Sequence, residues 1–77
     1  MKVKVSAPAF FSFKHIDPNG YMTLPEGATL NDVYKKLQVP LVMRKLIFSL
    51  VNYEHVKLRT KLKEGDVISF VSLIKGG

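Results

Sequence analysis

The sequence predicts a two-layer α+β domain in which one helix packs on a mixed sheet of four to five strands. Three observations support this fold class: several segments in which apolar residues alternate, one segment with the apolar spacing of a helix, and strong turn signals between them. A chain of 77 residues has room for one domain and one core. A single helix buries its apolar stripe against one face of a sheet, which gives two layers.

The first two strands are predicted on either side of a tight turn. Val3, Val5 and Ala7 alternate with polar residues, which is typical of a half-buried strand. The segment 17–20 reads Asp-Pro-Asn-Gly: its first residue can bond the backbone, its second presets φ and its last tolerates a positive φ. We therefore expect Tyr21–Leu24 to return as the second strand.

The helix is predicted to begin after Thr29, which is placed to act as its N-cap. Asp32 puts a negative charge in the first turn, where it interacts favourably with the helix dipole. Apolar residues follow at i, i+3, i+4 and i+7: Leu30, Val33, Tyr34 and Leu37. Pro40 disfavours helical backbone at the preceding residue, so the helix is expected to end at Val39 after about three turns.

A third strand is predicted after a connection at residues 41–45. Leu46–Val51 is a nearly continuous apolar run, which is typical of a central strand covered on both faces. A turn at 52–54 follows. The segment His55–Lys63 alternates again and is expected to be a short strand at the edge of the sheet.

The last strand is predicted over Val67–Ile74, after a turn at Glu64-Gly65-Asp66. Ile68 and Phe70 share one face of this strand. They could join Phe10, Phe11 and Phe13 in a docking patch for a partner protein, or all of these side chains could pack in the core. We favour the core interpretation for most of them and expect one phenylalanine ring near residue 10 to stay partly exposed.

The composition excludes several classes of function. Without cysteine the chain has no disulfide, no thiolate nucleophile and no zinc ribbon. His15 and His55 are far apart in the sequence and are expected to be surface residues rather than metal ligands. Asp17, Asp32 and Asp66 stand in turn or capping positions, so no pair of carboxylates indicates acid–base catalysis. The chain is not expected to be an enzyme.

The N-terminal residues lack the apolar core of a signal peptide, and no apolar run approaches the ~20 residues that cross a bilayer. We therefore expect a cytoplasmic domain that is not a membrane protein. The formal net charge of +6 suits an acidic partner or a nucleic acid, but also suits solubility alone. Stacking aromatic residues are not interleaved with the basic ones on one strand, so nucleic acid is the weaker alternative.

Four basic residues are expected on one face of the segment His55–Lys63: Lys57, Arg59, Lys61 and Lys63. They could bind phosphates or an acidic partner. Lysines on an edge strand also prevent sheet-to-sheet aggregation, and we favour this interpretation.

The sequence runs from its last strand directly into Lys75-Gly76-Gly77. Glycine has no Cβ, so such a tail can enter a narrow channel in another protein. We expect a domain over residues 1–74 and a flexible functional tail over residues 75–77.

Three stretches resemble the family of the molybdopterin-synthase small subunit and the thiamine-biosynthesis sulfur carrier. They are the segment 24–30 (Leu-Pro-Glu-Gly-Ala-Thr-Leu), Val51-Asn52 together with 62–66 (Leu-Lys-Glu-Gly-Asp), and the final strand with its Gly-Gly tail. The resemblance implies a ubiquitin-like β-grasp fold. It also implies that an activating enzyme adenylates the carboxylate of Gly77, and that a persulfide sulfur then converts the adenylate to a thiocarboxylate.

The resemblance implies that the chain is a carrier that binds no cofactor itself, with ATP used by the activating enzyme. Gly76 would give access and Lys75 would contact that enzyme. The expected partners are the activating enzyme, a persulfide protein and a molybdopterin-synthase large subunit.

Phe10 and Phe11 favour the branch that makes the molybdenum or tungsten cofactor, whereas Ser72-Leu73 replaces that branch's usual Pro-Pro pair. A carrier for thiamine thiazole or tRNA thiolation, and a ubiquitin-like protein modifier, therefore remain alternatives.

Overall fold

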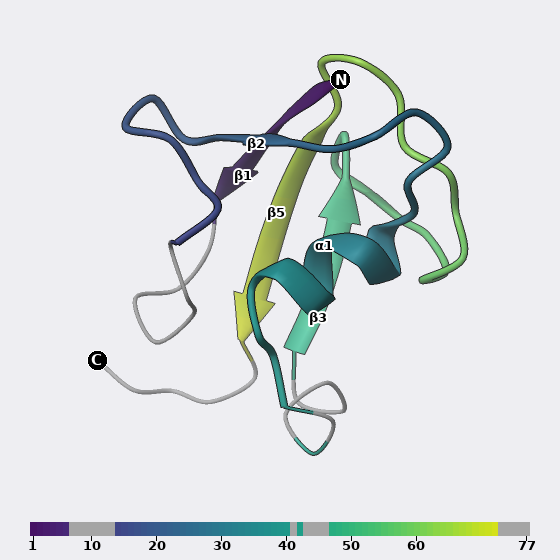
Figure 1. The fold of residues 1–77 in the computed structure, drawn as a ribbon. Helices are drawn as coiled ribbons and strands as arrows, with labels where there is room; N and C mark the ends of the chain where they lie inside the picture. The colour runs from purple at the N-terminus through teal and green to yellow at the C-terminus, as the bar shows by residue number, and fades with distance from the viewer. Residues whose placement is uncertain (7–13, 41, 43–46, 73–77) are drawn as a thin grey trace.

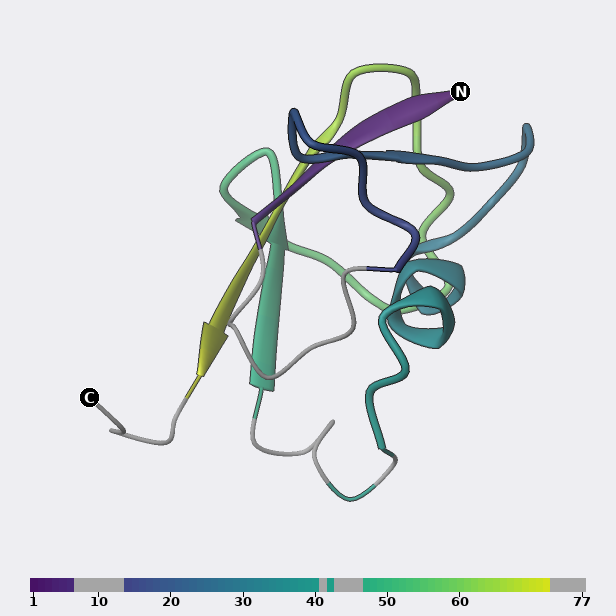
Figure 2. The same ribbon diagram turned by 60° about the vertical axis from the view of Figure 1, so that its left-hand side comes forward.

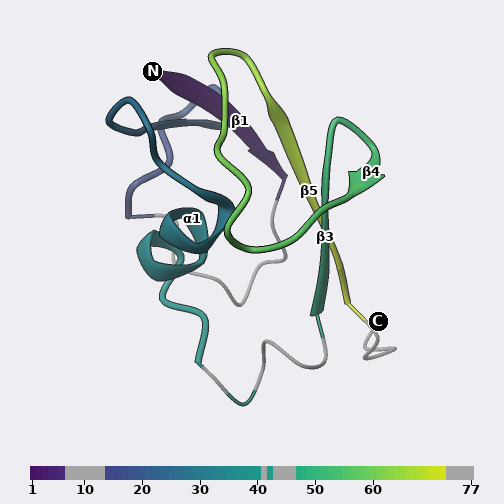
Figure 3. The same cartoon turned by 90° about the vertical axis from the view of Figure 1, so that its right-hand side faces the viewer.

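The strands form one mixed sheet in the order β2-β1-β5-β3-β4 in a computed structural model that describes residues 1–6, 14–40, 42 and 47–72. The elements along the chain are β1 (Lys2–Ser6), β2 (Tyr21–Thr23), α1 (Leu30–Lys36), β3 (Ile47–Val51), β4 (Glu54–His55) and β5 (Val67–Ser72). β1 and β5 are parallel, and the other neighbouring strands are antiparallel. α1 lies on one side of the sheet (Figures 1 and 3). The predicted α+β fold class is confirmed.

The core lies between α1 and the face of the sheet that it covers. Figure 2 shows the helix on this side of the sheet from a second direction. In β1, Val3 and Val5 are buried, while the alternating Lys2, Lys4 and Ser6 are exposed. The helix contributes its predicted stripe, and all four of its members are buried: Leu30, Val33, Tyr34 and Leu37. Met22, Leu24 and Ile68 complete the centre of this core. Among the described residues, no helix is long and apolar enough to cross a membrane.

Both predicted start signals act at the N-terminus of α1. The carboxylate of Asp32 accepts hydrogen bonds from the backbone N–H of Thr29 (2.8 Å) and from the Thr29 hydroxyl (3.2 Å). Thr29 has extended backbone angles, as an N-cap residue requires. The sequence therefore sets this end of the helix locally.

The helix ends earlier than the sequence predicts, after seven residues and about two turns. Gln38 adopts a positive φ of 56°. Its N–H donates to the carbonyl of Lys35, and the N–H of Val39 donates to the carbonyl of Tyr34. These two bonds form a Schellman motif, in which the buried side chains of Val39 and Tyr34 occupy the positions of its usual apolar contact. The motif closes the helix before Pro40 can act.

The predicted turn at residues 17–20 is confirmed. One carboxylate oxygen of Asp17 accepts the N–H groups of Asn19 (2.9 Å) and Tyr21 (2.8 Å). Gly20 has a φ of 86° and its N–H donates to the carbonyl of Asp17. The turn residues thus direct the chain into β2 by the interactions that their types favour.

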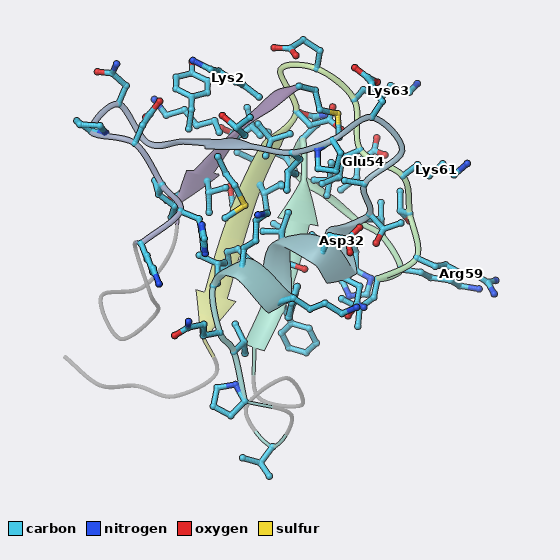
Figure 4. The ribbon with its side chains drawn as sticks, viewed as in Figure 1. Lys2, Asp32, Glu54, Arg59, Lys61 and Lys63 are labelled. Atoms are coloured by element: carbon cyan, nitrogen blue, oxygen red, sulfur yellow. The ribbon has the colours of Figure 1, made fainter. Side chains whose placement is uncertain are left out.

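The prediction of a strand over His55–Lys63 is wrong. β4 ends at His55, and the chain then turns, with the N–H of Thr60 donating to the carbonyl of Lys57 (3.0 Å). The basic residues of this segment therefore do not form a row on an edge strand. Arg59, Lys61 and Lys63 instead point outward from an irregular segment (Figure 4).

After His55, the backbone of this segment bonds to α1 and to the residues just before it instead of to the sheet. The carbonyl oxygens of Thr60 and Leu58 accept from the N–H groups of Leu30 (3.0 Å) and Asn31 (2.9 Å), which belong to the first turn of the helix. N–H groups in the first turn have no carbonyl partner inside a helix. The segment satisfies them, and this requirement outweighs the alternating pattern of its side chains.

Candidate functional site

The strand that leads to the predicted functional tail is the central strand of the sheet. β5 lies between β1 and β3. It pairs in parallel with β1 from Val67 to Ser69, and antiparallel with β3 from Ile68 to Ser72. Pairing with both neighbours at Ile68 and Ser69, and with β3 alone from Phe70 to Ser72, fixes the position and direction of β5 up to Ser72. The predicted site residues Lys75, Gly76 and Gly77 lie outside the described residues.

A side-chain clamp holds the beginning of β5. The amide of Asn52 donates to a carboxylate oxygen of Asp66 (2.9 Å), and its own oxygen accepts the backbone N–H of Val67 (3.0 Å). The other carboxylate oxygen of Asp66 accepts the N–H of Lys63 (2.8 Å). Asn52 has a φ of 52°, which asparagine tolerates better than most residues. The β3–β4 turn is thereby tied to the turn that precedes the last strand.

The two β5 residues considered for partner contact lie on the inner face. Ile68 has no exposed surface, so its role in this structure is packing and its side chain is not available to a partner. Phe70 is partly buried against the core, and its ring centroid lies 5.3 Å from that of Tyr34. The core interpretation therefore describes both positions. Phe10, Phe11 and Phe13, the other three residues in that prediction, lie outside the described residues.

The outer face of the sheet holds apolar residues that the sequence analysis did not single out. Phe48 is 44% exposed, and its ring meets that of His55 edge-on at 6.0 Å. Leu50 and Val67 are partly exposed on the same face. The expectation that β3 is covered on both faces is therefore wrong within the described part of the chain, because the single helix covers only the inner face. Since both faces of β3 carry apolar residues, its pattern could not reveal which one is open.

The same face becomes basic toward β1. Lys4 pairs with Tyr21 across β1 and β2, and its ammonium group lies 5.3 Å from the centre of the Tyr21 ring. Lys2 is exposed at the next outward position. The outer face thus combines an apolar centre on β3 with cations on β1, which suits contact with an acidic partner surface.

The three aspartates of the predicted turn and capping positions lie where the sequence placed them. No group of three or more His, Asp or Glu residues in the described part of the chain could hold a metal ion. Asp17, Asp32 and Asp66 each accept backbone N–H groups in turns or at the helix cap. A hydrogen bond from the Thr29 backbone holds the pKa of Asp32 below its ordinary value. These carboxylates stabilise the fold.

A five-stranded mixed sheet with one covering helix, in this strand order, defines a small ubiquitin-like β-grasp domain. Residues 16–77 match the model of the ThiS family, and the chain belongs to this family of ubiquitin-like sulfur carriers. The match includes β5 and runs through Gly77. No curated protein sequence matches the chain significantly.

Two solved structures share the fold. The putative molybdopterin converting factor subunit 1 from Pyrococcus furiosus superposes with a TM-score of 0.59 at 22% identity, covering 95% of each chain. SAMP1 from Haloferax volcanii superposes with a TM-score of 0.57 at 18% identity, covering 99% of this chain and 97% of that one. At these identities the likeness establishes the fold, and the family match identifies the class of protein.

Proposed function

We propose that this chain carries sulfur as a thiocarboxylate on Gly77 and delivers it during synthesis of the molybdenum or tungsten pterin cofactor. The observation that carries the proposal is the ThiS-family match, which extends through Lys75-Gly76-Gly77. The name of the Pyrococcus furiosus neighbour, a putative molybdopterin converting factor subunit, supports the choice of pathway. Thiamine thiazole synthesis and tRNA thiolation use the same carrier chemistry and are the alternatives.

The chemistry begins from an unreactive group, because a free α-carboxyl group is an anion at neutral pH. An activating enzyme transfers AMP from ATP to the Gly77 carboxylate and releases pyrophosphate, which makes an acyl adenylate with a good leaving group. The terminal sulfur of a protein persulfide then displaces AMP. A partner thiol cleaves the resulting S–S bond, which leaves the thiocarboxylate on Gly77 and a disulfide on the partner.

In this proposal the chain supplies position and access. The five residues after Ser72 span at most about 17–18 Å, and the pairing of Ser72 with Ile47 of β3 anchors the point from which this length is measured. The activating enzyme, the persulfide protein and a synthase large subunit supply the catalytic groups. The outer face of the sheet, with Phe48 at its apolar centre, is the surface that we assign to these partners.

The proposal is tested by incubating the chain with ATP, its activating enzyme and a persulfide donor, and by measuring its intact mass. We expect a mass increase that corresponds to replacement of one oxygen by sulfur. Deletion of Gly77 still leaves a glycine carboxylate but shortens the tail by about 3.5 Å. Misplacement of a reacting group by about 1 Å can lower the rate 10²-fold. We therefore expect the shortened chain to gain no sulfur, while its NMR spectrum shows that the domain is still folded.

The Lys75→Ala variant serves as a matched control, because it removes a tail charge and keeps the length. We expect it to accept sulfur, with a weaker dependence of the rate on salt. Sulfur uptake by the chain without Gly77 would show that the site is assigned to the wrong residue. Conjugates of higher mass in cell extract, formed without a thiocarboxylate, would favour a protein modifier instead.

A further inference from the structure

An open groove of about 620 Å³ lies beside β3, on the side away from β5. Its walls are the edge of β3 at Phe48 and Ser49, Tyr34 from α1, and the segment 55–59 that follows the β3–β4 turn. Tyr34 donates a hydrogen bond to the Ser49 hydroxyl (2.8 Å), so the buried polar groups at the base of the groove are paired with each other. The groove is separate from the sulfur-carrying tail in sequence.

The edge of β3 that borders this groove has a free stretch. β4 pairs only with Leu50 and Val51, so within the described part of the chain residues 47–49 have no strand partner on this side. The N–H of Asn52 donates to the carbonyl of Val67 in β5. In an antiparallel strand, successive residues direct their backbone N–H and C=O groups alternately to the two sides, so a residue three positions away points to the opposite side. Ser49 therefore directs its backbone groups away from β5, toward the groove. Such an edge can accept an added strand.

The charge on the walls of the groove indicates which side chains an added strand would carry. Lys57 and Arg59 line it and are exposed, and its described lining contains no carboxylate. The apolar part of the lining includes Leu58, which is 38% exposed, and Phe48. The formal net charge of the whole chain is +6. An occupant with carboxylates and apolar side chains at alternating positions complements both features.

We propose that the groove binds an extended acidic peptide segment of a partner protein, which adds to the sheet as a strand beside residues 47–49 of β3. Backbone hydrogen bonds to the β3 edge provide the affinity, and the side chains of Lys57 and Arg59 select for carboxylates. The site does not depend on the chemistry at Gly77, so a failure of this proposal and a failure of the sulfur-carrier proposal are separate results.

The test is an NMR titration of the full chain, at physiological ionic strength, with a short capped peptide of alternating valine and glutamate. We expect the largest shifts at the amides of Ser49 and of segment 55–59. The double variant Lys57→Glu/Arg59→Glu should weaken binding by about tenfold. The matched control Lys61→Glu/Lys63→Glu changes the charge equally outside the groove and should leave the affinity within about twofold.

A second peptide, N-methylated at alternate residues on the side that faces β3, keeps the charge and removes the strand hydrogen bonds. We expect its binding to be lost. Equal binding of this peptide would overturn strand addition, because charge attraction alone would then explain the affinity. Shifts confined to the outer face around Leu50 and Val67 would also overturn the proposal. Displacement of the peptide by a lower concentration of single-stranded RNA would assign the groove to nucleic acid instead.

Discussion

The clamp formed by Asn52 gives the most detailed prediction of stability. Replacement by alanine removes two side-chain hydrogen bonds, to Asp66 and from Val67, and leaves a residue with a Cβ at a φ of 52°. Two exposed hydrogen bonds, one of them to a carboxylate, contribute about 1–2 kcal/mol to the free energy of unfolding. The left-handed backbone adds about 1 kcal/mol for alanine. We therefore expect Asn52→Ala to lower the free energy of unfolding by about 2–3 kcal/mol.

The glycine variant separates these two contributions. Asn52→Gly loses the same hydrogen bonds but adopts a positive φ without steric strain, so we expect a loss of about 1–2 kcal/mol. The exposed turn residue Asn19 is the matched control, because its bond to Asp17 comes from the backbone N–H and survives replacement by alanine. Asn19→Ala should change the stability by less than about 0.5 kcal/mol.

The assay is urea unfolding followed by circular dichroism, with thermal unfolding as a second measurement. For a domain of this size the alanine variant should melt roughly 10–20 °C lower than the parent chain. The free energy of unfolding of the parent chain is expected to be about 4–12 kcal/mol, so the alanine variant remains folded in the absence of urea. Equal losses for Asn52→Ala and Asn52→Gly would refute the backbone argument, and no loss in either would refute the clamp.

Three further predictions concern other parts of the fold. Tyr53 is 78% exposed with a φ of 67°, so Tyr53→Gly should raise the free energy of unfolding by about 0.5–1 kcal/mol; a loss of stability would contradict the strain argument. Tyr34→Phe should cost about 1–2 kcal/mol, because it removes the buried hydrogen bond to Ser49; unchanged urea unfolding would argue against that bond. The pKa of Asp32 is lowered in the fold, chiefly by the hydrogen bond from the Thr29 backbone N–H. The contribution of this carboxylate to stability is therefore complete at a pH above its ordinary pKa of 3.8, and it is lost as the pH falls through the lower pKa of the folded state. Asp32→Asn should therefore be less sensitive to acid than the parent chain, and identical pH profiles would contradict this.

The sequence correctly predicted those parts of the fold that form through interactions between residues close together in the chain. The turn at 17–20 and the N-terminus of α1 form through hydrogen bonds from the residues that indicated them. The end of α1 was placed too late because the Schellman motif uses Gln38, whereas glycine or asparagine is the residue that indicates a positive φ at that position.

The errors at residues 55–63 and at Phe48 have a different origin. Alternation describes which side chains face inward, but the backbone carbonyls of Leu58 and Thr60 accept N–H groups of α1, which lies far away in the sequence. The exposure of Phe48 depends on how much of the sheet one short helix covers. For the candidate site, the sequence and its family resemblance indicated the Gly-Gly tail, whereas the outer face and the groove depend on tertiary packing.

The central claim is tested most directly by labelling the chain with a thiol-directed alkylating reagent after incubation with ATP, the activating enzyme and a persulfide donor. The chain contains no cysteine, so a thiocarboxylate would be its one group of thiol character. We predict that peptide mass analysis finds one label, on the peptide that ends at Gly77, and that omission of ATP abolishes it. An unlabelled chain in a reaction that consumes ATP and forms the Gly77 adenylate, or a label on any other residue, would contradict the account.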